Sequence, residues 1–334
     1  MKEYLDYQGL FQNMPKKDLE WLLCKLRDYK IKRRSTLNID KKISFGIELE
    51  FCDILLLYVE KRLKENERLK DWLSVYDKSC SYKADNYIIG GEVDTGILHD
   101  TKEEWETLRE ALTILKELKA HITDKNGLHV HIGSQILGSD KKNWFNFFKL
   151  WATYENIIYR FSYGEFLNPR PKIFQYAASM AEELKNDYKY FKKPSIPLSE
   201  VLFQIGDMKN NAVNFGHVHL ISAVKKEGNT IEFRCPNGTL DPVIWQNNVN
   251  LFSKLLLYAK STKFNDDIID TRYKHNKKNY QIYSYNQIYL EQALELCDMI
   301  FDNNLDKIYF LRQYLKSFET TLRIDKLIKC KKFT

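Results

Sequence analysis

The sequence predicts an α+β protein, in which helices pack against an antiparallel sheet. Segments that alternate apolar and polar residues lie in the middle of the chain, and segments with helical periodicity lie between and after them. The residues Lys-Lys-Glu-Gly-Asn at 225–229 suit a hairpin turn between strand-like segments at 212–224 and 229–235. Because a hairpin joins antiparallel neighbours, we expect an antiparallel sheet.

The first part of the chain alternates between predicted helix and strand. Residues 1–43 are expected to be largely helical, and 44–51 form a strand in which every second residue is apolar. A helix is expected over 54–76, where apolar residues give way to charged ones. Residues 86–94 are predicted as a second strand, kinked at a Gly-Gly pair.

Capping signals and periodicity define the next helices. Thr101 and Glu104 have the spacing of a capping box, and the apolar residues after them recur at intervals of three and four. Residues 128–133 form a third strand, and 140–161 form a helix with an aromatic stripe. A further helix is expected over 243–262, because Asp-Pro precedes it as a cap and first turn. A basic loop and a mainly helical segment at 284–330 complete the prediction.

The 334 residues allow one large domain or two average ones. Candidate site residues extend from position 48 to position 234, so their strands are expected to share one sheet. We therefore predict one catalytic domain at 44–262, a helical extension at 1–43, and a helical part at 263–334 packed on the same domain.

Composition limits the classes of protein. The formal charge of +7 favours a solvated basic face over a nucleic-acid surface. Six cysteines without any C-x-x-C pair argue against a disulfide framework or a zinc ribbon. The start lacks a signal core, and no run approaches the ~18 apolar residues of a membrane span. We expect a cytoplasmic protein with reduced thiols and no membrane partner.

Four predicted strands carry ionisable residues at alternating positions, so that the members of each pair point to one face. The pairs are Glu48 and Glu50, Glu92 and Asp94, His129 and His131, and Glu232 and Arg234. A strand with one wet face would also alternate in this way, and the chain has a second H-x-H pair at His217 and His219. However, the four pairs combine carboxylates, imidazoles and a guanidinium. Carboxylates with an imidazole suit Mg²⁺ or Mn²⁺, and a nearby Arg suits phosphate.

Five motifs, taken in order, resemble the amidoligase family. They are FGIELEF, GGEVDTGIL followed by a Trp-containing helix, GLHVHIG, AVNF and TIEFRCPNGTLDP. This family consists of carboxylate–amine ligases related to glutamine synthetase and γ-glutamylcysteine synthetase. The resemblance covers roughly residues 44–262 and depends on the order and spacing of the motifs. It implies a glutamine-synthetase-like fold, with a curved antiparallel sheet lining an active-site funnel.

The resemblance also implies ATP and two or more Mg²⁺ or Mn²⁺ ions. Glu48 and Glu50 would ligate different ions, and further ligands would come from Glu92, His129 and Glu232. His131 would approach the nucleotide phosphates. Arg234 would contact the transferring phosphoryl group or the substrate carboxylate.

The chain departs from the family pattern in places. Thr95-Gly96 stands where members often have Ser-Pro, and Lys209 stands where an Arg is expected upstream of AVNF. Lys keeps the charge but loses the bidentate fork. Asn214 is either a substrate or nucleotide contact or a residue of the sheet edge. Asp85 is a weaker candidate for the site.

The implied reaction joins a carboxylate to an amine through an acyl phosphate, on an amino acid, peptide or protein substrate. Glu50, Glu232 and Arg234 would act at the reacting groups. Two alternatives stay open at this point. One is a metal-dependent nuclease or phosphatase, and the other is a non-catalytic relative that binds nucleotide or peptide.

Overall fold

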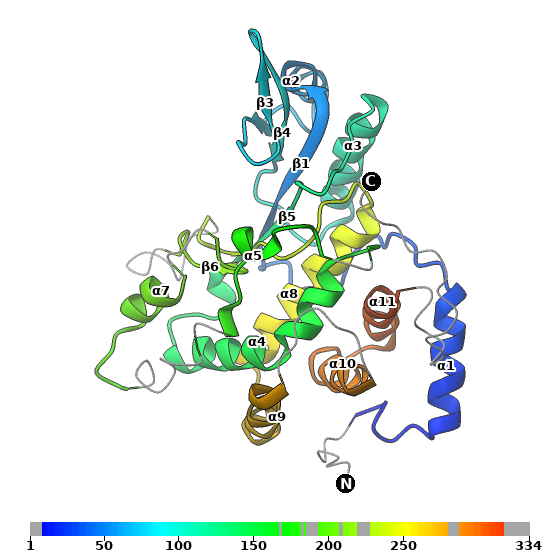
Figure 1. Cartoon of the computed structure of the whole chain (residues 1–334), viewed down its shortest axis with the longest axis vertical. Helices are drawn as coiled ribbons and strands as arrows, with labels where there is room; N and C mark the ends of the chain where they lie inside the picture. Colours follow the sequence, from blue (N-terminus) through cyan, green and yellow to red (C-terminus); the bar gives the residue numbers. More distant parts are fainter. Residues whose placement is uncertain are drawn as a thin grey trace.

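Figure 1 shows the computed structural model of the chain. It describes residues 9–166, 169–181, 184, 193–206, 210–218, 228–279 and 287–316. Within these residues the chain is a mixed α+β protein with an antiparallel sheet, as predicted.

The sheet is antiparallel at every described pairing, with strand order β2-β4-β1-β5-β7-β6 and with β3 also pairing to β4. The strands are β1 (Phe45–Leu55), β2 (Leu73–Val75), β3 (Tyr82–Ala84), β4 (Tyr87–Asp94), β5 (Leu128–Gly133), β6 (Val213–Asn214) and β7 (Thr230–Phe233). The long strand β1 lies between β4 and β5. The sheet curves from the β3–β4 hairpin toward β6 without closing into a barrel (Figure 1).

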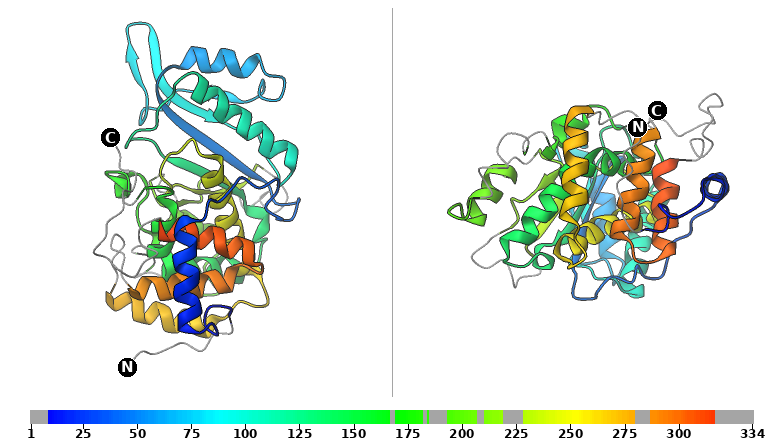
Figure 2. Two further views of the ribbon diagram at one scale, coloured as in Figure 1. Left: turned by 90° about the vertical axis from the view of Figure 1, so that its right-hand side faces the viewer. Right: turned by 90° about the horizontal axis from the view of Figure 1, so that it is seen from below.

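Helices surround the sheet and extend away from it (Figure 1). They are α1 (Lys16–Asp28), α2 (Leu56–Lys64), α3 (Lys102–Glu117), the 3-10 turn η1 (Ser134–Ile136), α4 (Lys141–Ser162), α5 (Ile173–Tyr176), α7 (Leu198–Gly206), α8 (Pro242–Lys260), α9 (Asp266–Asn279), α10 (Gln287–Ile300) and α11 (Asn304–Leu315). Helices α9, α10 and α11 lie at the end of the molecule opposite the β3–β4 hairpin (Figures 1 and 2). No helix in the described ranges is both long enough and apolar enough to cross a membrane.

Aromatic packing determines which face of the sheet is buried. Phe233 of β7 stacks on Phe252 of α8, with 4.2 Å between ring centroids, and also packs against Trp151 of α4. At the other end of the core, Phe45 of β1 stacks on Trp105 of α3 at 4.9 Å. Because side chains alternate along a strand, burying this face leaves the intervening polar residues on the opposite face.

The helix expected over 54–76 is shorter than predicted. Helix α2 ends at Lys64, and β2 begins at Leu73. The Asn66 side chain accepts a hydrogen bond from the backbone N–H of Arg68 at 2.9 Å, which stabilises a turn. The buried side chain of Leu69 then returns the chain to the core. Tertiary burial here overrides the helical propensity of the charged segment.

The loop expected after residue 262 was also wrong, since α9 occupies much of it. The Asn265 side chain accepts a hydrogen bond from the backbone N–H of Ile268 at 3.1 Å, which starts the helix. Ile269 is fully buried. On the exposed side of the helix, Asp266 and Asp270 pair with Lys149 of α4. These contacts with α4 were not visible in the local charge pattern.

Other predictions fall partly beyond the described residues. The hairpin at 212–235 contributes only the two-residue β6 and the antiparallel β7, and most of its turn lies outside the described ranges. The predicted helical tail is represented by α10 and α11, and 317–334 lies outside the described ranges. Of the range 1–43, the structure describes 9–43, where α1 is the helical part and the chain then runs to β1 without helix.

Candidate active site

Strand register brings all four predicted pairs onto one face of the sheet. Glu48 of β1 lies opposite Asp94 of β4 on one side and opposite His129 of β5 on the other. Glu50 lies opposite Glu92. Residues directly opposite each other on neighbouring strands have adjacent side chains, so these groups converge.

His129 lies at the centre of the cluster. Its Nδ1 is 2.5 Å from Glu48 Oε2 and 3.6 Å from Glu232 Oε1. Its Nε2 is 3.5 Å from Glu50 Oε1. Glu50, His129 and Glu232 are each less than 5% exposed. Three buried ionisable groups from three strands therefore share one small volume.

His131 forms the next layer of the site. Its Nε2 is 2.9 Å from Glu48 Oε1, and its Nδ1 is 3.1 Å from Thr230 Oγ1. Burial lowers the pKa of His131, but the hydrogen bond to Glu48 and the charges of Glu48 and Glu232 outweigh burial and raise it. Burial alone would raise the pKa of Glu48, but His129 and His131 hold it far below its usual range.

The other carboxylates are less well compensated. Burial raises the pKa of Glu92 to about 9, and repulsion by Glu48 and Asp94 adds to the shift. Burial and Glu48 likewise raise the pKa of Asp94 to about 6. Asp94 Oδ1 is buried without a hydrogen-bond partner among the described residues. Ionisation of the carboxyl groups that β4 contributes is therefore disfavoured.

Two groups of side chains can each surround a cation. One comprises Glu48, His129 and Glu232, and the other Glu50, Glu92 and His129, with ligand atoms within 4.8 Å of one another in each group. Carboxylate oxygens with one imidazole suit Mg²⁺ or Mn²⁺. A divalent cation in the second group would also offset the repulsion that raises the pKa of Glu92. The donor atoms present therefore fit the metal that the sequence predicts.

Arg234 and Asn214 both bind Glu232. Arg234 Nη1 donates to Glu232 Oε1, and Arg234 Nε donates to the carbonyl of Tyr176 at 3.4 Å. Asn214 Nδ2 donates to Glu232 Oε2 at 2.8 Å, while its Oδ1 accepts from the backbone N–H of Gly216 at 2.8 Å. Asn214 therefore orients a candidate cation ligand. Burial raises the pKa of Glu232, but His129 and Arg234 lower it overall.

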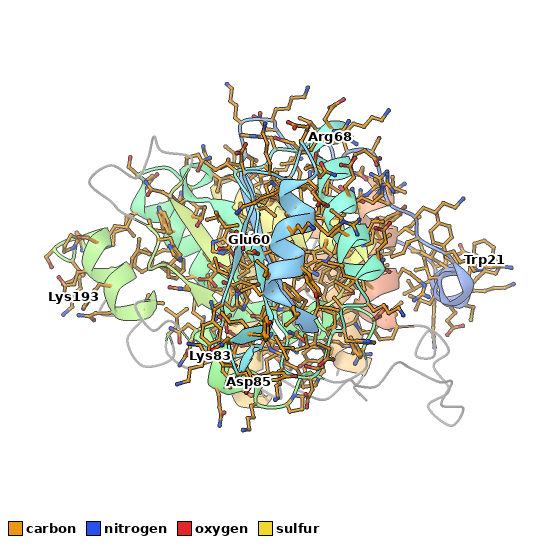
Figure 3. All side chains as sticks on the ribbon, turned by 90° about the horizontal axis from the view of Figure 1, so that it is seen from above. Trp21, Glu60, Arg68, Lys83, Asp85 and Lys193 are labelled. Atoms are coloured by element: carbon orange, nitrogen blue, oxygen red, sulfur yellow. The ribbon has the colours of Figure 1, made fainter. Side chains whose placement is uncertain are left out.

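The remaining candidates are the second histidine pair, Lys209 and Asp85, and the structure places them differently. His217 reaches the cluster, since its Nε2 is 3.7 Å from Glu232 Oε2 and its ring centroid is 5.6 Å from that of His131. His219 and Lys209 lie outside the described residues. Asp85 is exposed in the turn between β3 and β4, and Figure 3 shows it with Lys83 at the periphery of the molecule.

A cavity of about 310 Å³ opens beside the cluster. Glu48, Asp94, His131 and Thr230 contribute polar groups to its wall. The remainder of the wall is formed by Ser44, Phe45, Gly46, Ile47, Thr95, Gly96, Ile97 and Gly228. The departure from the family pattern at Thr95-Gly96 thus lies in the cavity wall.

Two residues of the site were missed in the sequence. The backbone N–H of Gly127 donates to Glu50 Oε2 at 2.5 Å. Arg170 is 3% exposed, and its Nη2 donates to the carbonyl of Arg234 at 3.0 Å. Arg170 comes from a proline-rich loop without periodicity, so no local signal could indicate its position. Gly127 was visible only as the first residue of the GLHVHIG motif.

The fold and the site together define an α+β protein with a candidate metal centre on the polar face of its sheet. A family model described as "Putative amidoligase enzyme" matches residues 41–256. The match spans more than half of the chain, so the chain belongs to this amidoligase family and is an enzyme of the ligase kind. No curated protein matches the chain in sequence.

Proposed function

We propose that the chain is an ATP-dependent carboxylate–amine ligase that forms an amide or isopeptide bond through an acyl phosphate. One observation carries this proposal. Four strands of a single sheet direct three buried groups, Glu50, His129 and Glu232, together with Glu48 and Glu92, into one cluster, with Arg234 bonded to its edge. Membership of the amidoligase family supports the ligase class.

The two side-chain groups would hold two cations. Glu48, His129 and Glu232 would hold the first, and Glu50 and Glu92 the second, beside His129 Nε2. When bound there, Mg²⁺ or Mn²⁺ would offset the charge of the ATP phosphates and hold the terminal phosphate near the substrate carboxylate. This arrangement agrees with the implied placement of Glu48 and Glu50 on different ions.

His131 and Arg234, which both neighbour Glu232, would contact the phosphates. Arg234 has a guanidinium that can bind a phosphate or carboxylate with two parallel hydrogen bonds. The cavity beside His131 would take the nucleoside part of ATP, since its wall combines apolar side chains with three glycines. Asn214 would act through Glu232 rather than on the nucleotide. Lys209, which keeps the charge of the expected Arg, stays a predicted ATP-binding residue outside the described residues.

The proposed ligase reaction needs no nucleophilic side chain from the protein. A carboxylate oxygen of the substrate attacks the terminal phosphorus of ATP, and the bond to ADP breaks. An amine then attacks the acyl carbon, phosphate leaves with the bonding electrons, and the amine loses a proton to a nearby carboxylate or water. Arg234 stabilises the charge of the transferring phosphoryl group. Burial raises the pKa of Cys235 to about 12, so its thiol is a poor nucleophile.

We propose that the curved sheet is the core of a glutamine-synthetase-like catalytic fold. Its concave polar face would be the funnel wall, and α4 and α8 would support it from behind. The family resemblance favours a peptide or protein as one substrate. Residues 44–262 would form the catalytic domain, with the helical segments before and after it packed on the same core.

An acyl-phosphate trap tests this function directly. The protein is incubated with ATP, Mg²⁺, hydroxylamine and a panel of amino-acid and peptide carboxylates, and hydroxamates are sought by mass spectrometry. We expect a hydroxamate and an equal amount of ADP with at least one carboxylate, both lost in EDTA. The variant Glu232→Gln serves as a matched inactive control.

Other outcomes would decide against the ligase. Cleavage of nucleic acid or of phosphate esters without ADP formation would favour the nuclease or phosphatase alternative. Nucleotide binding without ADP formation, with every carboxylate in the panel, would favour the non-catalytic alternative.

A further inference from the structure

Arg170 is a buried cation at the cluster that the proposed reaction does not use. It lies between α4 and α5, and its backbone N–H donates to Asn237 Oδ1 at 3.0 Å. Its Nη2 donates to the carbonyl of Arg234 at 3.0 Å. Its Nε is buried and has no hydrogen-bond partner among the described residues. A guanidinium that is 3% exposed is costly unless a negative charge compensates it.

Gly127 locates the guanidinium relative to the cluster. A Cβ atom added at Gly127 would lie 2.0 Å from Arg170 Nη1 and 3.0 Å from His129 Nε2. The backbone N–H of the same glycine donates to Glu50 Oε2. Arg170, His129 Nε2 and Glu50 therefore meet around one residue. Only glycine leaves space for the guanidinium to approach this closely.

The charges around the cluster divide into pairs. Glu48 is paired with His129 and His131, and Glu232 is paired with Arg234. Glu50 makes a longer contact, with His129 Nε2 at 3.5 Å, and the charge of Glu50 acts on Arg170. Within the described residues Arg170 makes no direct ion pair with Glu50, so the two charges act on each other through space, across Gly127.

We propose that Arg170 is a positioning residue that serves as a permanent countercharge to Glu50, and so keeps Glu50 ionised and in place beside Glu92 at the second cation site before a cation binds. The same guanidinium binds the main chain of Arg234, so it also connects the second cation site to the phosphate-binding side of the cluster. The part of this inference that concerns cations rests on the proposed function. The interaction between Arg170 and Glu50 does not depend on the proposed function.

A double-mutant cycle in EDTA measures the pairing. The four proteins are the wild type, Arg170→Gln, Glu50→Gln and the double variant, each melted by differential scanning calorimetry. Removing one partner of a buried charge pair leaves the other uncompensated, so Arg170→Gln should lower Tm by roughly 5 to 10 °C. In the Glu50→Gln background the same change should lower Tm by less than about half as much.

A second variant and a matched control make the test specific. Arg170→Lys keeps the charge, so it should recover part of the Tm and show the same dependence on Glu50. Arg160 is also a buried arginine, 7% exposed, and donates its Nε to the carbonyl of Tyr314 at 3.1 Å. Arg160→Gln should lower Tm equally in both backgrounds, because the Tyr314 carbonyl that Arg160 binds belongs to α11 and not to the cluster.

Adding Mn²⁺ separates this inference from the proposed function. Mn²⁺ should raise the Tm of Arg170→Gln by more than it raises that of the wild type, because the metal replaces the lost charge. An equal Tm loss in both Glu50 backgrounds, for both Arg170 variants, would overturn the inference whatever the enzyme does. If the coupling is present but no protein responds to Mn²⁺, Arg170 remains the partner of Glu50 and the metal-dependent ligase is refuted.

Discussion

Glu92→Gln should change how the stability of the metal-free protein depends on pH. The pKa of Glu92 is raised to about 9 in the folded chain, against 4.5 for the unperturbed group. Between these values the folded chain keeps a proton that the unfolded chain has lost. Stability should therefore fall as pH rises, because the unfolded state binds fewer protons. Glutamine resembles the protonated acid, so the variant should lack this contribution.

The size of the effect follows from the same shift. One group changes the free energy of unfolding by at most about 1.4 kcal/mol per pH unit. From about pH 6.5 to about pH 8.5 the loss is therefore at most about 2.7 kcal/mol, or roughly 5 °C in Tm for a chain of this size. Solvent screening of the partly buried Glu92 carboxylate reduces this loss, so we expect the Tm of the wild type to fall by about 2 to 5 °C over this pH range.

Calorimetry in EDTA at several pH values provides the measurement. The quantity of interest is the Tm of the wild type minus that of Glu92→Gln, because contributions such as that of His131 largely cancel in it. Wild type and variant should melt at similar temperatures below pH 4.5, where Glu92 is protonated in both states, and the stability advantage of the variant should grow from about pH 6.5 to about pH 8.5. Parallel pH profiles would refute the electrostatic account of Glu92. Saturating Mn²⁺ should abolish the difference in slope, since the cation binds the ionised carboxylate.

Three further predictions concern the site. Glu48→Gln and Glu232→Gln should abolish ATP turnover and lower Tm in EDTA at neutral pH, because each removes a carboxylate whose pKa its histidine or arginine partners lower; normal ADP formation in either would contradict the assignment. Arg234→Lys should lose most turnover because lysine lacks the bidentate fork, whereas His219→Ala should keep it; an inactive His219→Ala would instead assign the second histidine pair to the site. Asn214→Ala should weaken Mn²⁺ binding about 10- to 100-fold by calorimetric titration, since it frees Glu232, and unchanged affinity would remove Asn214 from the site.

Local patterns were sufficient to predict much of the architecture. Thr101 accepts a hydrogen bond from the backbone N–H of Glu104 at 3.2 Å, and Asp241 accepts one from that of Val243 at 2.9 Å, as their positions before helices indicated. Capping depends on residues close in the chain, so it is visible in sequence. The capping box itself is altered, because the Glu104 carboxylate accepts from the backbone N–H of His99 rather than from that of Thr101.

Errors arose where distant contacts decided the outcome. Helix α2 stops early because Leu69 is buried against the core, and α9 forms where Ile269 is buried and aspartates reach Lys149 of another helix. Neither contact partner is near in sequence. A charged segment is helical or not according to what it packs against, which propensity alone does not contain.

The sequence by itself determined which residues share a face of each strand, because alternation is a local property of the extended chain. Together with the order of its motifs, it also determined the amidoligase family. Only the tertiary structure decided which of these faces meet, and so which carboxylates can share a cation. It brought Gly127 to Glu50 across 77 residues and Arg170 to Arg234 across 64. Such approaches depend on strand register and loop paths, which arise from packing of the whole chain.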